Sequence, residues 1–179
     1  MSIDCALLEA ERELLDFDCG NSSVNALVAK SFLAHAVKQQ LTYKILYQNI
    51  VVGFWTVSMR GVTLDNSDAK VAECYEDPPE FGAVKLNYIA VSKEVQGCGI
   101  GSSAMWYIIK KAQELYQQWP VRMLILDAIR DKMEWYQKFG FEAICQEDIS
   151  SDSATVQMYL DLMPDREKGE LDAYTSHIV

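Results

Sequence analysis

The chain has 179 residues, of which half are apolar and 11% aromatic, so it is long enough to bury the core of one packed domain. Its formal net charge of −10 disfavours a nucleic-acid partner bound through a broad basic face. No apolar run reaches the length of a transmembrane helix, and the first residues lack the pattern of a signal peptide. We therefore expect a cytoplasmic protein with no membrane partner.

Cysteine and histidine usage restricts the chemistry. The five cysteines lie far apart with no C-x-x-C pair, which favours reduced thiols over a disulfide framework or a zinc site. The only histidines are His35 and His177, which argues against a Ser-His or Cys-His hydrolase and against a histidine-rich metal site. We expect no metal.

In chain order, the first half of the sequence predicts a strand, a turn, a helix and a hairpin. The expected ranges are a strand over 3–8, a turn over 18–21, a helix from 21 or 22 to 39 or 40, and strands over 41–47 and 50–59. Asn21 or Ser22 is the candidate N-cap, and Gln48-Asn49 is the expected hairpin turn. Gly53, inside the second hairpin strand, predicts a β-bulge or a close backbone approach.

Residues 65–80 interrupt this pattern. The segment is polar, contains six carboxylates and ends after Pro78-Pro79, so a solvated connector is the simpler interpretation. The alternative is a loop over the acceptor site that recognises a cation, because such a loop is long for a compact domain.

The second half alternates between strands and helices. The expected elements are a strand over 84–91, a helix over 102–117, a strand over 121–127, a helix over 129–139, and strands over 141–147 and 154–162. From Pro164 onward the chain is charged and lacks apolar periodicity, so we expect 164–179 to be a tail that is mobile or taken up by a partner surface. Residues 1–163 then form one α/β (α+β) domain, a mixed sheet flanked by helices.

Residues 96–101, Gln-Gly-Cys-Gly-Ile-Gly, place three glycines between an expected strand and an expected helix. A helix start carries unpaired N–H groups and a partial positive charge, and glycines let those groups close on an anion such as a pyrophosphate. No Gly-Lys-Ser/Thr follows, and the spacing differs from G-x-G-x-x-G, so neither a P-loop nor a dinucleotide fingerprint is present. The spacing fits Gln-x-x-Gly-x-Gly, and taken alone it leaves a turn that only caps the helix as the alternative.

A second segment gives the glycine loop a context. The apolar run 121–126 is typical of a buried strand, and residues 135–141, Trp-Tyr-Gln-Lys-Phe-Gly-Phe, follow on a helix that ends near Gly140. Gln-x-x-Gly-x-Gly followed by aromatic-Tyr-x-Lys-x-Gly-Phe resembles the acetyl-CoA site of the GNAT N-acetyltransferase superfamily. The resemblance covers about residues 84–142. It implies a mostly antiparallel sheet that bulges before the glycine loop and splays between two parallel strands.

The resemblance also implies contacts with acetyl-CoA as cosubstrate. Backbone groups of Ile89, Ala90 and Val91 would pair with the pantetheine arm. The pyrophosphate would lie on backbone amides of the loop and the helix start, at Gln96, Gly97, Cys98, Gly99, Ile100, Gly101 and Ser102. Many members carry an Asn near the start of the tyrosine-bearing helix, where this chain has 127–132, Asp-Ala-Ile-Arg-Asp-Lys. Arg130, or Lys132 as the alternative, is therefore the expected phosphate contact there.

Tyr136 is the predicted catalytic residue. An amine that attacks the thioester forms an oxyanionic intermediate and expels a thiolate, to which a phenol can donate a proton. Backbone N–H groups near Val91 could stabilise the oxyanion. The strand over 84–91 offers no carboxylate as a general base. Glu73, Glu80 and Glu94 are alternatives that would act through a water, and no base is assigned. Cys98 and His35 are interpreted as structural or incidental rather than catalytic.

The N-terminal half resembles one branch of the superfamily in particular. Residues 17–20, Phe-Asp-Cys-Gly, with Val24-Asn25 and 52–58, Val-Gly-Phe-Trp-Thr-Val-Ser, are similar to GNAT toxins. Those toxins acetylate the amino group of aminoacyl-tRNA and are restrained by a ribbon-helix-helix antitoxin. The acidic balance speaks against a tRNA enzyme. The favoured hypothesis is acetyl transfer to a primary amine of a small molecule or protein, and the alternatives are the toxin or a non-catalytic acyl-CoA-binding module.

Partners follow from these hypotheses. Exposed final strands often pair in this superfamily, so a homodimer is one expectation. A ribbon-helix-helix antitoxin and tRNA are expected only for the toxin.

Overall fold

The computed structural model describes residues 2–63, 80–145, 149 and 152–175. It divides into two compact units, each built from two stretches of chain. Unit 1 contains Met1–Met59 and Lys85–Lys111, and unit 2 contains Arg60–Val84 and Ala112–Val179. Of the acidic segment 65–80, all but Glu80 lies outside the described residues.

In unit 1 four strands are neighbours in the order β1-β2-β3-β4. These are β1 (Asp4–Leu7), β2 (Leu41–Tyr47), β3 (Ile50–Thr63) and β4 (Glu80–Val91), of which β3 and β4 continue into unit 2. The pairs β1–β2 and β2–β3 are antiparallel. Gln48 and Asn49 both have positive φ, at 52° and 62°, as a two-residue hairpin turn requires, so the predicted hairpin is confirmed.

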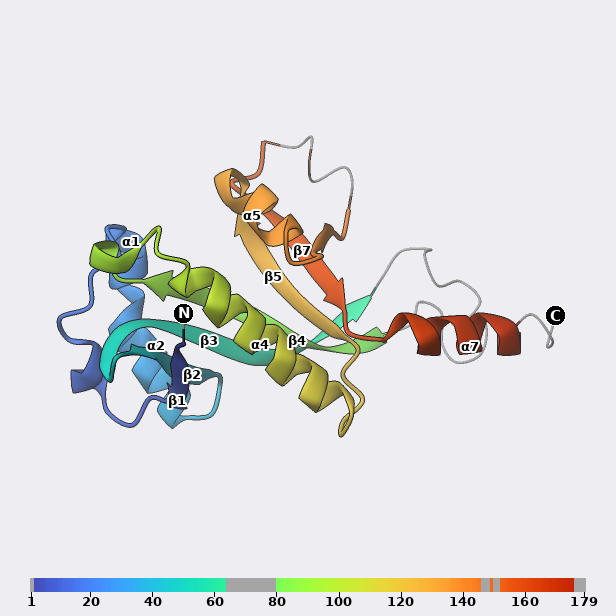
Figure 1. Cartoon of the computed structure of the whole chain (residues 1–179), viewed down its shortest axis with the longest axis horizontal. Coiled ribbons are helices and arrows are strands. Elements are labelled where there is room, and N and C mark those ends of the chain that lie inside the picture. Colours follow the sequence, from blue (N-terminus) through green and yellow to red (C-terminus); the bar gives the residue numbers. More distant parts are fainter. Residues whose placement is uncertain (1, 64–79, 146–148, 150–151, 176–179) are drawn as a thin grey trace. The chain divides into compact units, whose positions relative to one another are not determined.

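Helices cover both faces of the unit 1 strands (Figure 1). They are η1 (Glu11–Leu14), α1 (Ser22–Asn25), α2 (Leu27–Ala36), η2 (Lys93–Val95) and α4 (Ile100–Tyr116). Phe54 belongs to a buried cluster with Val28 of α2, whereas the ring of the next residue, Trp55, lies 6.3 Å from that of Tyr107 in α4. Because successive strand residues point to opposite faces, α2 and α4 lie on opposite sides of β3.

Of the two candidate N-caps, Asn21 caps α1, because its side chain accepts hydrogen bonds from the N–H groups of Ser23 and Val24. The helix predicted as continuous to 39 or 40 is two helices, α1 and α2, and ends at Ala36.

In unit 2 the strand order continues from β4 as β5-β7-β6. The strands are β5 (Met123–Ile129), β7 (Thr155–Asp161) and β6 (Glu142–Ala143), and both pairs among them are antiparallel. The N–H of Arg122, just before β5, donates to the carbonyl of Gly82 near the start of β4 at 2.8 Å. The two strands therefore begin at the same end and run parallel, joined by α4 as the crossover. The predicted mixed, mostly antiparallel sheet flanked by helices is confirmed.

Three elements of unit 2 differ from expectation. The helix predicted over 129–139 is a short η3 (Arg130–Lys132) followed by α5 (Met133–Gln137). Of the strand predicted over 141–147, residues 146 and 147 lie outside the described part, and within 141–145 the strand is β6. The segment after Pro164 forms α7 (Asp165–Thr175). Contacts with other parts of unit 2 attach it: the hydroxyl of Tyr116 donates to Glu167, 51 residues further along the chain, and Lys168 pairs with Asp161 at 3.4 Å. Since Tyr116 is distant in sequence, apolar periodicity within the segment could not predict its contact with the helix.

Among the residues that the structure describes, no helix combines the length and the apolar character needed to cross a membrane.

Candidate active site

The glycine loop of unit 1 joins β4 to α4, as predicted, and Gln96–Gly99 are exposed. Gly97 and Gly99 have φ of +76° and +83°, a region that favours glycine. A Cβ built on either would meet no described atom within 4 Å beyond the chain neighbours. The loop therefore requires glycine for its backbone conformation rather than for lack of space, and it stays open to a ligand.

Helix α4 begins at Ile100, two residues earlier than predicted. The N–H of Ser103 donates to the carbonyl of Gly99 at 3.0 Å, the first bond of the helical pattern. The N–H groups of residues 100–102 precede that bond and have no carbonyl one turn back. The helix has 17 residues and no acidic residue in its first turn, so its own side chains do not neutralise the positive end of its dipole. This arrangement fits the charge and the hydrogen-bond acceptors of a diphosphate.

Residues Ile89–Val91 at the end of β4 are held closely by β3. A Cβ on Gly53 would lie 2.4 Å from the carbonyl oxygen of Ala90, so only glycine permits this approach. The N–H of Ser92 donates to the carbonyl of Val52 at 2.7 Å and fixes the strand end. The close approach predicted at Gly53 is confirmed.

The alternation of side chains along β4 breaks just before the loop. Phe54 and Ser58 are four residues apart and so lie on one face of β3. Phe54 shares a buried cluster with Ala90, and the hydroxyl of Ser58 donates to Asn87 at 3.1 Å. Asn87 and Ala90 are three residues apart yet lie on the same face, which requires the irregularity that a β-bulge produces. The GNAT resemblance implies a bulge at this place.

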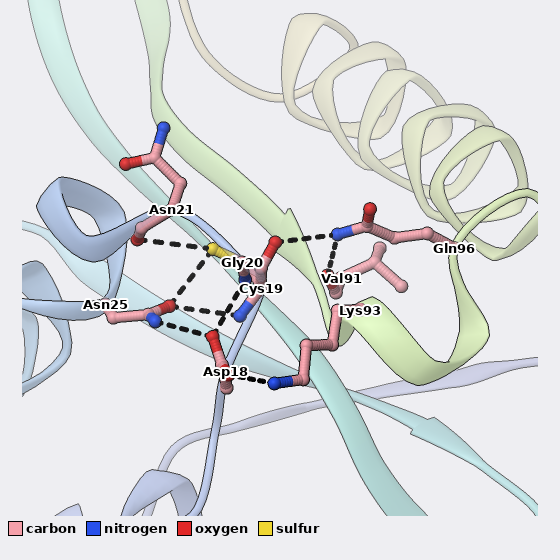
Figure 2. A network of polar contacts seen from close by, with 8 residues as sticks. All are labelled: Asp18, Cys19, Gly20, Asn21, Asn25, Val91, Lys93 and Gln96. Atoms are coloured by element: carbon pink, nitrogen blue, oxygen red, sulfur yellow. Dashed lines mark hydrogen bonds and ion pairs between the residues drawn. The ribbon is translucent and has the colours of Figure 1, made fainter.

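The side chain of Gln96 is directed at the backbone of unit 1 (Figure 2). Its amide Nε2 donates to the carbonyls of Cys19 and Val91, each at 2.9 Å. The contact predicted between Gln96 and the cosubstrate uses the backbone N–H of this residue. The two side-chain bonds leave that N–H available.

Tyr136 lies in unit 2 on α5, in a cluster of aromatic rings. Its ring packs edge-on against Trp135 at 4.9 Å and Phe141 at 5.9 Å between centroids. The N–H groups of Phe139 and Phe141 both donate to its carbonyl, and Gly140 closes the turn with φ of +89°. Burial raises the pKa of Tyr136 to about 12, so the phenol is protonated at neutral pH and can act as a proton donor.

Arg130, the predicted phosphate contact of unit 2, begins η3. Its guanidinium donates to the backbone carbonyls of Ile149, at 2.8 Å, and Ser153. These bonds attach the guanidinium of Arg130 to backbone groups of unit 2, the unit to which it belongs.

The remaining titratable candidates have structural surroundings or lie outside the described part. Nδ1 of His35 accepts the N–H of Thr42 at 3.0 Å, and burial, with a smaller contribution from Lys38, lowers the pKa of His35. The neutral imidazole thus ties α2 to β2. Among the described residues no three His, Cys, Asp or Glu side chains gather as a metal-binding group.

The structure brings to the glycine loop a group of residues that the sequence motifs did not connect with it. Asp18, Cys19 and Asn25 contact Lys93 and Gln96 at the entry to the glycine loop (Figure 2). The signal was present, since 17–20 and Val24-Asn25 carry the resemblance to the toxin branch, but local pattern gave no reason to connect them with the loop.

Comparison with known proteins adds a family and a fold. A family model described as an acetyltransferase (GNAT) domain matches residues 45–143, more than half of the chain. No curated protein matches the sequence.

Among solved structures, AtaT complexed with acetyl-methionyl-tRNAfMet is 17% identical with a TM-score of 0.71, and the match covers 95% of this chain and 99% of that one. A tyrosine-to-phenylalanine variant of the AtaT toxin, bound to the C-terminus of the antitoxin AtaR and acetyl-CoA, is 16% identical with a TM-score of 0.69 and coverage of 90% and 94%. A similar variant of KacT is 17% identical with a TM-score of 0.71 and coverage of 96% and 99%. At these identities the likeness shows the fold.

Proposed function

Because the chain belongs to the GNAT acetyltransferase family, we propose that it moves the acetyl group of acetyl-CoA to a primary amine by direct attack on the thioester. The observation that carries the proposal is the exposed glycine loop at the start of α4, with two residues at positive φ and no acidic residue in the first helical turn. This is the anion-binding arrangement that a diphosphate needs.

The cosubstrate contacts in this proposal are mostly backbone groups. The N–H groups of Gln96–Ser102 bind the diphosphate, and Ile89–Val91 pair with the amides of the pantetheine arm. Backbone pairing explains why apolar side chains suffice on this part of β4. Ile100 contributes through its N–H alone, since its side chain is 1% exposed. The guanidinium of Arg130 has five N–H donors, of which the bonds to Ser153 and Ile149 use two, and a phosphate would be bound through the others.

Tyr136 acts as the proton donor. The amine nitrogen bonds to the thioester carbon, the carbon–sulfur bond breaks, and the phenol donates to the departing thiolate. The proton released by the attacking nitrogen restores the neutral phenol through solvent. A phenol with a pKa of about 12 stays protonated below about pH 10, a range that includes the pH values at which an α-amino group is already neutral, so the donor is available there.

The residue content of β4 favours an acceptor that needs little help to lose its proton. Glu80 and Lys85 are the only charged residues of the strand, and Glu80 stands at its first position, in unit 2. An α-amino group has a pKa of about 8, well below that of a lysine side chain, so a substantial fraction is neutral near physiological pH. Such an amine can attack without a dedicated base.

One observation favours aminoacyl-tRNA as the acceptor, the second candidate function. The excess of acidic over basic residues lies in unit 2, with eight basic and nineteen acidic residues, whereas unit 1 has eight basic and seven acidic. Residues 19–59 contain three lysines and no carboxylate side chain. Unit 1, where the glycine loop lies, therefore has no net negative charge of its own that would repel a polyanion. An antitoxin partner would accompany this function.

The test measures thiol release from acetyl-CoA over small amines, peptides and aminoacyl-tRNA. We expect turnover with at least one α-amino acceptor and a fall of about a hundredfold in kcat for Tyr136→Phe. Tyr159→Phe is the matched control, because that hydroxyl lies 3.4 Å from Glu142, elsewhere in unit 2. No binding of acetyl-CoA by folded protein would refute the function, and equal rates for Tyr136→Phe would remove Tyr136 from the mechanism.

A further inference from the structure

We propose that Asp18 and Gln96 are positioning residues that set the glycine loop for cosubstrate binding. They belong to a polar network, called here the loop clamp, which consists of Asp18, Cys19, Asn25, Lys93 and Gln96 (Figure 2). The clamp joins the N-terminal segment of unit 1 to the chain between β4 and the loop. The inference rests on the proposed function, because it requires acetyl-CoA to bind at the loop.

Gln96 is the central link. A side-chain amide has two N–H bonds, and Gln96 uses them on the carbonyls of Val91 and Cys19, both 2.9 Å away. The first bond spans the turn from the last residue of β4 to the first residue of the loop. The second ties that turn to a segment 77 residues earlier in the chain. Both bonds fix the residue whose own N–H is the first proposed contact with the diphosphate.

Asp18 holds the other side of the same turn. Its carboxylate pairs with the ammonium of Lys93 at 2.6 Å, and its backbone carbonyl accepts the N–H of Lys93 at 2.9 Å. Lys93 begins η2, which ends one residue before Gln96. The hydrogen bond from Lys93 is the main cause that holds the pKa of Asp18 well below its ordinary value, so the carboxylate is charged at neutral pH. Asp18 thus fixes the first residue of η2 through Lys93, and Gln96 fixes the chain directly after its last residue.

The N-terminal side of the clamp is itself ordered by short polar contacts. Asp18 also accepts the N–H of Gly20 at 2.8 Å and the side-chain amide of Asn25 at 2.7 Å. The oxygen of Asn25 accepts the N–H of Cys19 at 3.0 Å and its thiol at 3.1 Å. Gly20 turns the chain with φ of +80°. This segment presents the Cys19 carbonyl to Gln96 in one orientation.

The two charged side chains of the clamp align the loop rather than support the core. Those of Lys93 and Asp18 are 58% and 43% exposed and lie outside the buried apolar cluster of unit 1, against which Cys19 of the clamp packs. Gly97 and Gly99 follow directly, and glycine is the most freely rotating residue. A loop with two such residues binds an anion tightly only if the residues at its start are already fixed. Otherwise the loop would lose conformational entropy on binding, and its affinity for the anion would be lower.

The test compares acetyl-CoA binding and turnover in Gln96→Leu, Asp18→Ala and Asp18→Asn. We expect the Kd and KM for acetyl-CoA to rise about tenfold in the first two, with kcat at saturating acetyl-CoA within about twofold of the unmodified chain. Asp18→Asn keeps an acceptor oxygen for Gly20 and Asn25 but loses the charge opposite Lys93, so its effect should be intermediate.

Glu13→Ala is the matched control. Glu13 also pairs with a lysine, Lys44, and also accepts two N–H groups, those of Glu9 and Ala10, but it lies outside the clamp. Its affinity for acetyl-CoA should stay within about twofold of the unmodified chain. Thermal unfolding of each variant shows that it is folded, and if Asp18→Ala does not fold, Gln96→Leu and Asp18→Asn carry the test.

Each result separates the two proposals. If the unmodified chain binds acetyl-CoA and the clamp variants bind it equally well, the positioning role is wrong and the proposed function stands. Equal loss of affinity in Glu13→Ala also overturns the positioning role, because any weakening of unit 1 would then have the same effect. If the unmodified folded chain does not bind acetyl-CoA, both proposals fail.

Discussion

The contact between Gly53 and β4 provides a sharp prediction. In Gly53→Ala the new Cβ would lie 2.4 Å from the carbonyl oxygen of Ala90, 3.1 Å from a methyl of Ile45 and 3.3 Å from the Cα of Val91. A favourable carbon–oxygen contact is about 3.3 Å or longer, so the methyl overlaps the Ala90 oxygen by about 0.9 Å. Both strands must move apart, because the oxygen belongs to the backbone and cannot rotate away.

We expect this overlap to lower the free energy of unfolding by about 2–3 kcal/mol, the usual cost of overpacking. For a chain of this length the melting temperature should fall by about 5–10 °C. Because Ala90 and Val91 are displaced, the affinity for acetyl-CoA should fall as well. Urea denaturation and calorimetric titration measure the two effects on the same protein.

Gly169→Ala is the control for this experiment. Gly169 lies in α7, and a Cβ there would meet no described atom within 4 Å. Alanine is preferred to glycine inside a helix, so this variant should gain up to about 1 kcal/mol and bind acetyl-CoA normally. If Gly53→Ala proved as stable as the unmodified chain, the close approach of β3 and β4 and the argument built on it would be wrong.

Three further predictions concern the loop, acid stability and the phenol of Tyr136. Gly99→Ala places a methyl in open space at φ +83°, so calorimetry should show weaker acetyl-CoA binding, and urea denaturation a loss of only about 1–2 kcal/mol. Burial raises the pKa of Asp161, but hydrogen bonds, chiefly from Arg122, outweigh it and lower the pKa. Its stabilisation is therefore present above the unfolded pKa of about 3.9 and is lost as the pH falls through the lower folded value, so Asp161→Asn should flatten the acid dependence of the urea midpoint. Because the pKa of Tyr136 is about 12, kcat should show no alkaline fall from this group below about pH 10, and a fall near pH 8 that disappears in Tyr136→Phe would contradict its protonated role.

Elements with a strong local signal could be predicted from the sequence. Gln48-Asn49 between two apolar strands identified the hairpin, and the Asn21 cap identified the start of α1. The long apolar stripe of α4 gave its extent within two residues. The elements around α5 were less accurate, because a helix of five residues and a strand of two have too few residues to show a period.

The candidate site divides in the same way. The glycine loop and the segment around Tyr136 could be found because each is a short stretch whose function depends on neighbouring residues. The role of the Gln96 side chain could not be found, because its partner Cys19 is 77 residues away and contributes only a backbone carbonyl. A backbone group carries no sequence signal, since every residue type supplies it.

By itself, the sequence determined the family and the mixed sheet, and it supplied the helix start proposed to bind an anion and the phenol proposed as donor, because these follow from local backbone preferences and from motifs of a few residues. Only the tertiary structure decided that β4 breaks its alternation before the loop, that Gly53 must lack a side chain, and that Asp18 grips Lys93. It also decided that the charged segment after Pro164 is helical. Each of these depends on contacts between residues far apart in the chain, whose positions are set by packing rather than by local conformation.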